Sequence, residues 1–321
     1  MKFKQALLME PRKLEVHEVE KIPEDDDVVI KLASCGLCNW ELGFWTGDLK
    51  AMRGYPSPLG HEWAGVVESV GPKVTKIKPG QKVTAFVRGF GGFAEYLFTK
   101  EDLLHILTDN VDVKYAMGEP QKCVVTVLRA TRAEAADVGV VLGCGPMGQW
   151  CVQGLNGNYL EKLIAVDIDD KRLEMAKQFG ATHAINSKKA NVLEELTKIT
   201  NGRLADFVIE GTGIPALLNE AQSYLKRGRG RLVMMSSHHD TAKDFDFRIA
   251  VGKALELIVA HPPHAYDGED DLRRAVALIN NGTFKNKELV SHEFPLDKVQ
   301  EAFETFNNKP ADFIKGIVVC N

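Results

Sequence analysis

The stretch DVGVVLGCGPMGQWCVQGLNGNYLEKLIAVD, residues 137–167, decides the fold. Asp137–Leu142 is a short, valine-rich apolar run, which predicts a buried strand. Gly143, Gly145 and Gly148 follow at once with the spacing G-x-G-x-x-G. Glycines in this spacing allow a tight turn and let the backbone come close to a pyrophosphate.

The residues after the glycines complete a βαβ pattern. Pro146 suits the first turn of a helix, which Met147–Leu155 can form. A second apolar run, Leu163–Val166, predicts another strand, and Asp167 ends it. A glycine turn that binds nothing is the alternative. The full order of strand, turn, helix, strand and acid instead favours a dinucleotide-binding unit.

The acid at the end of the second strand predicts the coenzyme. A carboxylate at Asp167 can accept hydrogen bonds from the ribose hydroxyls and repels a 2′-phosphate, so NAD is favoured over NADP. Lys171 and Arg172 are close in sequence and keep NADP open as the less favoured coenzyme.

Further strands and helices alternate after this unit. Ala205–Ile209 and Arg231–Met235 are predicted strands, and their ends should lie beside the coenzyme. The predicted fold is therefore α/β, with a doubly wound parallel sheet. The candidate coenzyme-binding residues are Gly143, Gly145, Pro146, Met147, Gly148, Asp167, Arg172, Gly211, Thr212, Met235 and Ser236.

Composition narrows the class of protein. The 321 residues are 45% hydrophobic and 26% charged, as in an ordinary globular protein. The net charge of −4 shows no excess of positive charge that would indicate nucleic-acid binding. No apolar run is long enough to span a bilayer, and the first residues do not resemble a signal peptide. Six scattered cysteines fit a reducing compartment, so we expect a cytoplasmic protein without a membrane or nucleic-acid partner.

The first hundred residues are β-rich and carry a possible metal site. Short Val/Ile-containing runs separated by turn residues predict a small β-barrel rather than a parallel sheet. The pair Cys35 and Cys38, with His61, Glu62 and Glu119, offers thiolate, imidazole and carboxylate donors, a plausible set for catalytic zinc. Cys35 with Cys38 could instead be a redox C-x-x-C pair, but that pair normally begins a helix in a thioredoxin-like unit.

Motifs along the whole chain resemble the zinc-dependent medium-chain dehydrogenases, in the sorbitol and threonine dehydrogenase branch. The matching pieces, in the order of the family, are GLCNWELGFWTG, LGHEWAGVVESVG, KPGQKVTAF, GEP, VLGCGPMGQ, AVDIDDKRLEMAKQFGATHAIN, DFVIEGTG and HEFPLDKVQEAFE. The resemblance implies a GroES-like catalytic domain at residues 1–133, a Rossmann domain at 134–262 and a return to the catalytic domain at 263–321.

The resemblance also implies roles for individual residues. Cys38 and His61 match the first two zinc ligands of the family, and Glu62 matches an acid that binds zinc or exchanges with water. Glu119, in a Glu-Pro pair, is the preferred third ligand, and Cys123 is its rival.

Other matching positions carry supporting roles. Glu41 takes the place of an acid that hydrogen-bonds the zinc-bound histidine and fixes its tautomer, with a plain surface acid as the alternative. Trp40, Phe44 and Trp45 either line the substrate side or belong to the core.

The chain departs from the family in three places. The lobe that carries four cysteines and a structural zinc is missing, so we expect one catalytic zinc and no structural zinc. Trp40 and Gly43 replace the residues that usually relay the substrate proton, so either Glu62, Glu119 or water serves instead or the chemistry differs. His238 or His239 could face the nicotinamide, or both could be exposed loop residues.

The expected activity is hydride transfer between NAD(H) and a secondary alcohol, polyol, sugar or cyclitol, with zinc polarising the hydroxyl. The alternatives are a zinc-free quinone or enone reductase of the same superfamily and a catalytically silent NAD-binding regulatory protein. Relatives are dimers or tetramers, so a homodimer or homotetramer is expected.

Overall fold

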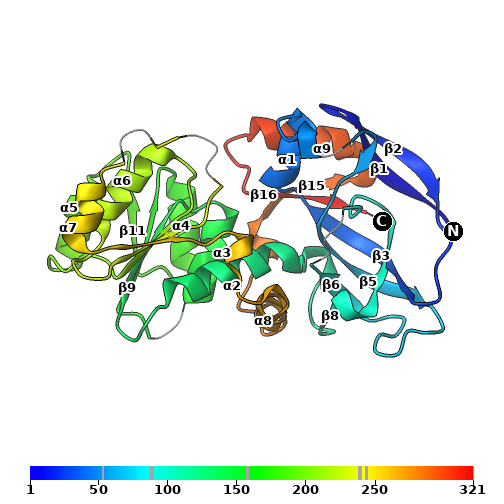
Figure 1. The fold of residues 1–321 in the computed structure, drawn as a ribbon, viewed down its shortest axis with the longest axis horizontal. Coiled ribbons are helices and arrows are strands. Elements are labelled where there is room, and N and C mark those ends of the chain that lie inside the picture. Colours follow the sequence, from blue (N-terminus) through cyan, green and yellow to red (C-terminus); the bar gives the residue numbers. More distant parts are fainter. Residues whose placement is uncertain (53, 87–89, 157–158, 238–240, 243–244, 321) are drawn as a thin grey trace. The chain divides into compact units, whose positions relative to one another are not determined.

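The computed structural model describes residues 1–52, 54–86, 90–156, 159–237, 241–242 and 245–320. Within these residues the chain forms two compact units (Figure 1). Unit 1 contains Met1–Gln121 and Leu272–Asn321, and unit 2 contains Lys122–Asp271. Unit 1 is therefore built from both ends of the chain, whereas unit 2 is one continuous segment.

Unit 2 contains a parallel sheet of six strands in the order β11-β10-β9-β12-β13-β14. The strands are β9 (Val138–Leu142), β10 (Lys162–Asp167), β11 (His183–Asn186), β12 (Phe207–Glu210), β13 (Arg231–Met234) and β14 (Glu256–Val259). The helices between them are α3 (Pro146–Leu155), α4 (Asp170–Gln178), α5 (Val192–Ile199), α6 (Pro215–Tyr224) and α7 (Phe247–Lys253). This is the doubly wound order that the alternating pattern predicts.

The turn between β9 and α3 depends on the absence of side chains. Gly143 has a φ of 93°, in the left-handed region that favours glycine. A Cβ atom on Gly148 would lie 2.0 Å from the carbonyl oxygen of Gly143, so only glycine lets α3 approach the turn this closely. Pro146 occupies the first turn of α3. Local sequence thus dictates this part of the fold.

Unit 1 contains a sheet in the order β15-β16-β3-β5-β6-β8, with β7 paired to β3, and a small sheet β2-β1-β4. The strands are β1 (Lys2–Glu10), β2 (Lys13–Glu20), β3 (Asp27–Gly36), β4 (Ser57–Pro58), β5 (Glu62–Val70), β6 (Lys82–Ala85), β7 (Tyr96–Lys100), β8 (Leu104–Leu107), β15 (Val290–Pro295) and β16 (Lys315–Val319). All pairs are antiparallel except β15 with β16.

Helices cover and connect these sheets. They are α1 (Asn39–Thr46), α2 (Gly118–Thr131), α8 (Gly268–Asn280) and α9 (Val299–Asn308). Single 3₁₀ turns occur at Lys50–Met52, Glu101–Leu103, Val113–Tyr115, Pro262–His264, Lys287–Leu289 and Leu296–Lys298. Helix α9 packs on α1, where the rings of Phe303 and Trp45 lie 6.1 Å apart.

Each unit has its own apolar core. In unit 2 the valines and isoleucines of β9 and β10, such as Val140 and Ile164, are fully buried. In unit 1 the core joins β3 and β5 to α9, with Ile30, Trp63 and Phe303 completely buried. Two independent cores agree with two units that fold around separate sheets.

The α/β fold class with a separate β-rich unit is confirmed. Strand β1, the nine-residue partner of β2, and helix α2, which carries Glu119, were not expected from the sequence. Among the described residues, no helix combines the length and apolar character needed to cross a bilayer.

Candidate functional site

Cys38 lies at the junction of a buried strand and a helix. It follows β3 and stands immediately before α1, with its backbone still extended. Burial raises the pKa of the Cys38 thiol, and the Glu62 carboxylate raises it further. The thiol therefore needs a cation beside it to lose its proton near neutral pH.

His61 is held by a buried carboxylate. The Glu41 side chain is completely buried on α1, and its Oε1 lies 3.0 Å from Nδ1 of His61. The same oxygen accepts a hydrogen bond from the backbone N–H of Gly60, at 2.5 Å. Burial of the imidazole opposes its charge, but the Glu41 carboxylate raises the pKa of His61 well above its usual value. This contact turns Nε2, the other ring nitrogen, away from Glu41.

Gly60 permits this arrangement. Its φ is 99°, and a Cβ atom there would lie 2.5 Å from the backbone nitrogen of Phe93. A side chain at this position would therefore push the loop off its neighbour and move both the N–H that Glu41 binds and the adjacent His61.

Glu62 is paired with a lysine from the far end of the chain. Lys315 on β16 is buried and donates hydrogen bonds to Oε2 of Glu62 and, at 2.9 Å, to the carbonyl oxygen of Leu37. Burial opposes the charge on the amine, yet the Glu62 carboxylate raises the pKa of Lys315 overall. Lys315 was not among the site residues expected from the sequence. A single lysine at the start of an otherwise apolar strand was the one feature of the sequence that could have indicated it.

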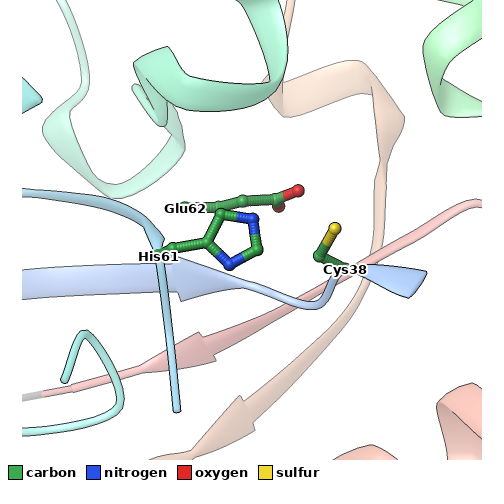
Figure 2. Close-up of side chains that lie close together, drawn as sticks. All are labelled: Cys38, His61 and Glu62. Atoms are coloured by element: carbon green, nitrogen blue, oxygen red, sulfur yellow. The ribbon is translucent and has the colours of Figure 1, made fainter. Parts of the chain in front are cut away.

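Cys38, His61 and Glu62 form a compact group of metal-binding atoms (Figure 2). A sulfur, a ring nitrogen and a carboxylate oxygen from these residues all lie within 4.8 Å of one another. Glu119, in the first turn of α2, brings its Oε2 to 3.7 Å from Nε2 of His61. Thiolate, imidazole and carboxylate together suit Zn²⁺, so the donor set fits the metal.

The two rival cysteines are placed elsewhere. Cys35 is fully buried within β3, pairs with Val318 of β16, and burial raises the pKa of its thiol. Cys123 is partly buried on α2, beyond the point where that helix passes into unit 2. The compact group of donor atoms in the described residues contains neither of them.

A second group of acidic side chains surrounds the amine of Lys100. Glu24, Asp26 and Asp27 lie close enough to hold a cation, but Nζ of Lys100 lies 2.6 to 2.9 Å from a carboxylate oxygen of each. These three acids thus have a structural partner within their own unit.

In unit 2, Asp167 shapes the glycine turn. Its Oδ2 accepts a hydrogen bond from the backbone N–H of Cys144 at 2.7 Å, and its Oδ1 accepts from Ile168 and Asp169 at 2.7 and 3.0 Å. The carboxylate is thus fixed at the end of β10, with Gly143, Gly145, Pro146, Met147 and Gly148 forming the turn and the start of α3. Three backbone donors orient this acid before any coenzyme binds.

The ends of β12 and β13 carry the remaining candidates. The Glu210 carboxylate accepts hydrogen bonds from the backbone N–H groups of Thr212 and Gly213, at 2.6 and 3.2 Å, which fixes the turn after β12. A Cβ atom on Gly211 would lie 2.7 Å from Cε of Met235, so Gly211 and Met235 are packed together. Ser236 follows Met235 directly.

Arg172 is in the first turn of α4, where its backbone N–H donates to Asp169. His238 and His239 lie outside the described residues.

Comparison with known proteins identifies the family. The family model described as alcohol dehydrogenase GroES-like domain matches residues 24–109, and the one described as zinc-binding dehydrogenase matches residues 146–280. The chain belongs to the zinc-type medium-chain alcohol and polyol dehydrogenases. It is therefore an oxidoreductase with a GroES-like unit and a Rossmann unit.

Relatives of this dehydrogenase act on polyols and diols according to their names. Sorbitol dehydrogenase of Bacillus subtilis is 25% identical, covering 94% of this chain and 93% of the relative. D-arabitol-phosphate dehydrogenase of Enterococcus avium is 27% identical, covering 88% of each. The crystal structure of 2R,3R-butanediol dehydrogenase from Bacillus subtilis superimposes with a TM-score of 0.86 at 25% identity, covering 99% of this chain and 100% of that one.

We predict that zinc binding by this dehydrogenase releases about one to two protons per ion at pH 7. The raised pKa values of Cys38 and His61 keep both groups protonated without metal, so the proton must leave when the metal arrives. Zinc affinity should therefore fall as the pH is lowered, by about tenfold per pH unit for each proton released.

Isothermal titration with zinc, in buffers of different ionisation enthalpy, measures the number of protons. Glu41→Gln removes the charge that raises the pKa of His61, so it should release fewer protons near pH 7. Zinc binding without proton release would contradict the prediction.

Proposed function

We propose that this protein is a zinc-dependent, NAD-preferring dehydrogenase of secondary alcohols or polyols. The observation that carries the proposal is the compact group formed by Cys38, His61 and Glu62 in unit 1. Such a donor set, with carboxylates beside it, suits a catalytic zinc that keeps a position open for substrate. The glycine turn of unit 2 supplies the coenzyme site.

Four residues would hold one zinc ion: Cys38 and His61 as ligands, with Glu62 and Glu119 supplying carboxylate oxygens. A zinc ion held there would supply Lewis acidity that lowers the pKa of the substrate hydroxyl. The Lys315 ammonium group, paired with Glu62, offsets one of the negative charges gathered around the ion. A closed set of four cysteines is absent from the sequence, so we propose one zinc per chain.

The chain itself orients the reacting groups. Glu41 fixes the ring of His61 through Nδ1, which leaves Nε2 for the metal. Because Trp40 and Gly43 cannot relay a proton, we assign proton transfer to the carboxylates of Glu62 and Glu119 or to water between them. A nicotinamide coenzyme held at the glycine turn of unit 2 would supply the hydride acceptor or donor.

The proposed coenzyme is NAD. The Asp167 carboxylate ends β10 and is held by three backbone N–H groups, so it cannot turn away from a 2′-phosphate without losing those bonds. Its negative charge and its acceptor oxygens suit free ribose hydroxyls.

We also propose that the enzyme works in the cytoplasm as a homodimer, or as a homotetramer built on the same contact. All six cysteines are free thiols, as expected in a reducing compartment.

Strand β14 is the last strand of the parallel sheet, and its Leu257 and Val259 are 38% and 59% exposed. Phe247 and Val251 on α7, directly before it in the chain, are 65% and 79% exposed. An apolar sheet edge of this kind suits a second copy of the chain.

Cys38→Ser should abolish tight zinc binding and reduce turnover by at least about a thousandfold, because the hydroxyl is a poor substitute for a thiolate ligand. Zinc content by atomic emission and NADH formation with sorbitol or 2,3-butanediol as substrate would check this. Cys123→Ser is the matched control and should keep both zinc and activity. Loss of zinc from Cys123→Ser alone would assign the third ligand to Cys123 instead.

Asp167→Ala should lower kcat/KM for NAD by about tenfold to a hundredfold, because charged hydrogen bonds to the ribose are lost. The ratio of kcat/KM for NAD to kcat/KM for NADP should therefore fall. Steady-state kinetics with both coenzymes measure the effect. Asp169→Ala, which removes the cap of α4 but leaves Asp167 in place, controls for local loosening. Equal losses for NAD and NADP in Asp167→Ala would contradict the assignment.

Val259→Lys should dissociate the oligomer, because a charge replaces an apolar side chain at the proposed contact. Sedimentation velocity measures the mass. Ile22→Lys, at an 82% exposed position in unit 1, is the control and should leave the mass unchanged. An unaltered oligomer in Val259→Lys would place the contact elsewhere.

A further inference from the structure

Gln149 is a fully buried polar side chain on α3, directly after Gly148, the last glycine of the turn. Its Nε2 donates one hydrogen bond to the carbonyl oxygen of Cys144 at 3.1 Å and another to the carbonyl oxygen of Arg172 at 2.8 Å. Because an amide nitrogen carries two N–H groups, these two bonds use its whole capacity. The side chain is thus committed to two backbone carbonyls, one on each side of it.

The other end of the same amide is unsatisfied. Oε1 of Gln149 is buried and accepts no hydrogen bond from the residues that the structure describes. A buried acceptor without a donor lowers the stability of the fold. An apolar side chain would avoid this cost, and α3 does bury apolar side chains at Val152 and Leu155. A glutamine that is retained here for two carbonyl contacts is typical of a functional position.

The first contact fixes the peptide unit between Cys144 and Gly145. This peptide bond is trans, so its C=O and its N–H point in opposite directions. Gln149 holds the Cys144 carbonyl toward the buried side of α3. The N–H of Gly145 is therefore turned to the opposite side. A Cβ atom on Gly145 would meet nothing within 4 Å beyond its neighbours in the chain, so open space lies beside this glycine.

This open space suits the pyrophosphate of the coenzyme. Gly145 is the N-cap of α3 and has no side chain with which to bond the first turn. The N–H groups of that turn and the positive end of the helix attract an anion. Cys144 is fixed from both sides, because Asp167 accepts a hydrogen bond from its N–H at 2.7 Å and Gln149 binds its carbonyl.

The second contact joins the glycine turn to α4. Arg172 is in the first turn of that helix, whose N-cap is Asp169, and the N–H of Asp169 in turn donates to Asp167. One buried amide thus connects the turn that faces the pyrophosphate with the segment that carries the ribose-binding acid. A site that is already ordered binds more tightly, because the coenzyme does not have to order it.

We propose that Gln149 is a positioning residue for the coenzyme: it turns the Gly145 N–H toward the pyrophosphate and holds the glycine turn against α4. It acts through the backbone and does not touch the coenzyme. The inference rests on the coenzyme half of the proposed function and is independent of the metal.

Direct binding to the full-length protein tests this role without turnover. Gln149→Met removes both N–H donors and keeps the length of the side chain. The Kd for NADH, measured by the fluorescence of the coenzyme, should rise about tenfold, because a charge-assisted hydrogen bond to the phosphate is weakened. Gln153→Met is the matched control, since Gln153 is also buried on α3, one turn further from the glycines. It should change the Kd by less than about twofold.

Two further probes separate positioning from a general loosening of unit 2. ADP-ribose contains the pyrophosphate, so its affinity for Gln149→Met should fall as much as that of NADH. Adenosine has no phosphate and should keep its affinity; displacement of NADH measures both. Equal losses for adenosine and ADP-ribose would reduce Gln149 to a structural residue and overturn the proposal, as would an unchanged Kd for NADH.

Gln149→Leu covers the case in which Gln149→Met does not fold, and circular dichroism checks both variants. Leucine also lacks the donors and packs well in a helix, so it should show the same selective loss of affinity for NADH and ADP-ribose. Failure of both variants to fold would make Gln149 a structural residue and contradict the assignment. Absence of NADH binding by the unaltered protein would instead refute the coenzyme half of the proposed function.

Discussion

The buried contact between Glu41 and His61 is the constraint on which the metal-binding site depends. One carboxylate oxygen receives both the ring nitrogen of His61 and the backbone N–H of Gly60, so it ties helix α1 to the loop before β5. Cys38 immediately precedes that helix and Glu62 begins that strand. Fixing one pair of elements therefore brings three donor atoms together. Such a carboxylate is stable in the interior only beside a positive partner, which a protonated or metal-bound imidazole provides.

The segments that were predicted well from the sequence are those whose structure depends on residues close together in the chain. The glycine turn of unit 2 depends on residues within a few positions of one another, and the predicted strand and helix agree with β9 and α3 to within one residue. The family pattern likewise pointed to Cys38 and His61, which the structure brings into one group with Glu62. Such segments can be predicted from the sequence because local backbone geometry, rather than packing against distant segments, determines their structure.

The parts that the sequence could not predict depend on distant segments. Lys315 meets Glu62 across 253 positions of the chain, and nothing near Glu62 indicates that its partner lies in the last strand. Trp40 and Trp45 occupy one short helix, yet Trp40 is 39% exposed and Trp45 packs against Phe303. Helix α9 and the side chain of Arg12, which lies over the ring of Trp45, cover one of the two rings. Side-chain roles of this kind require the tertiary structure.

The pairing of β16 between β15 and β3 has a consequence for the order in which the protein assembles on the ribosome. The coenzyme-binding unit is continuous and is synthesised before β16, so its sheet can close while translation continues. The other sheet lacks the strand that joins β15 to β3 until β16 emerges. During that interval the Glu62 carboxylate lacks its ammonium partner, so a nascent chain has a finished nucleotide fold well before it has a finished metal-binding site.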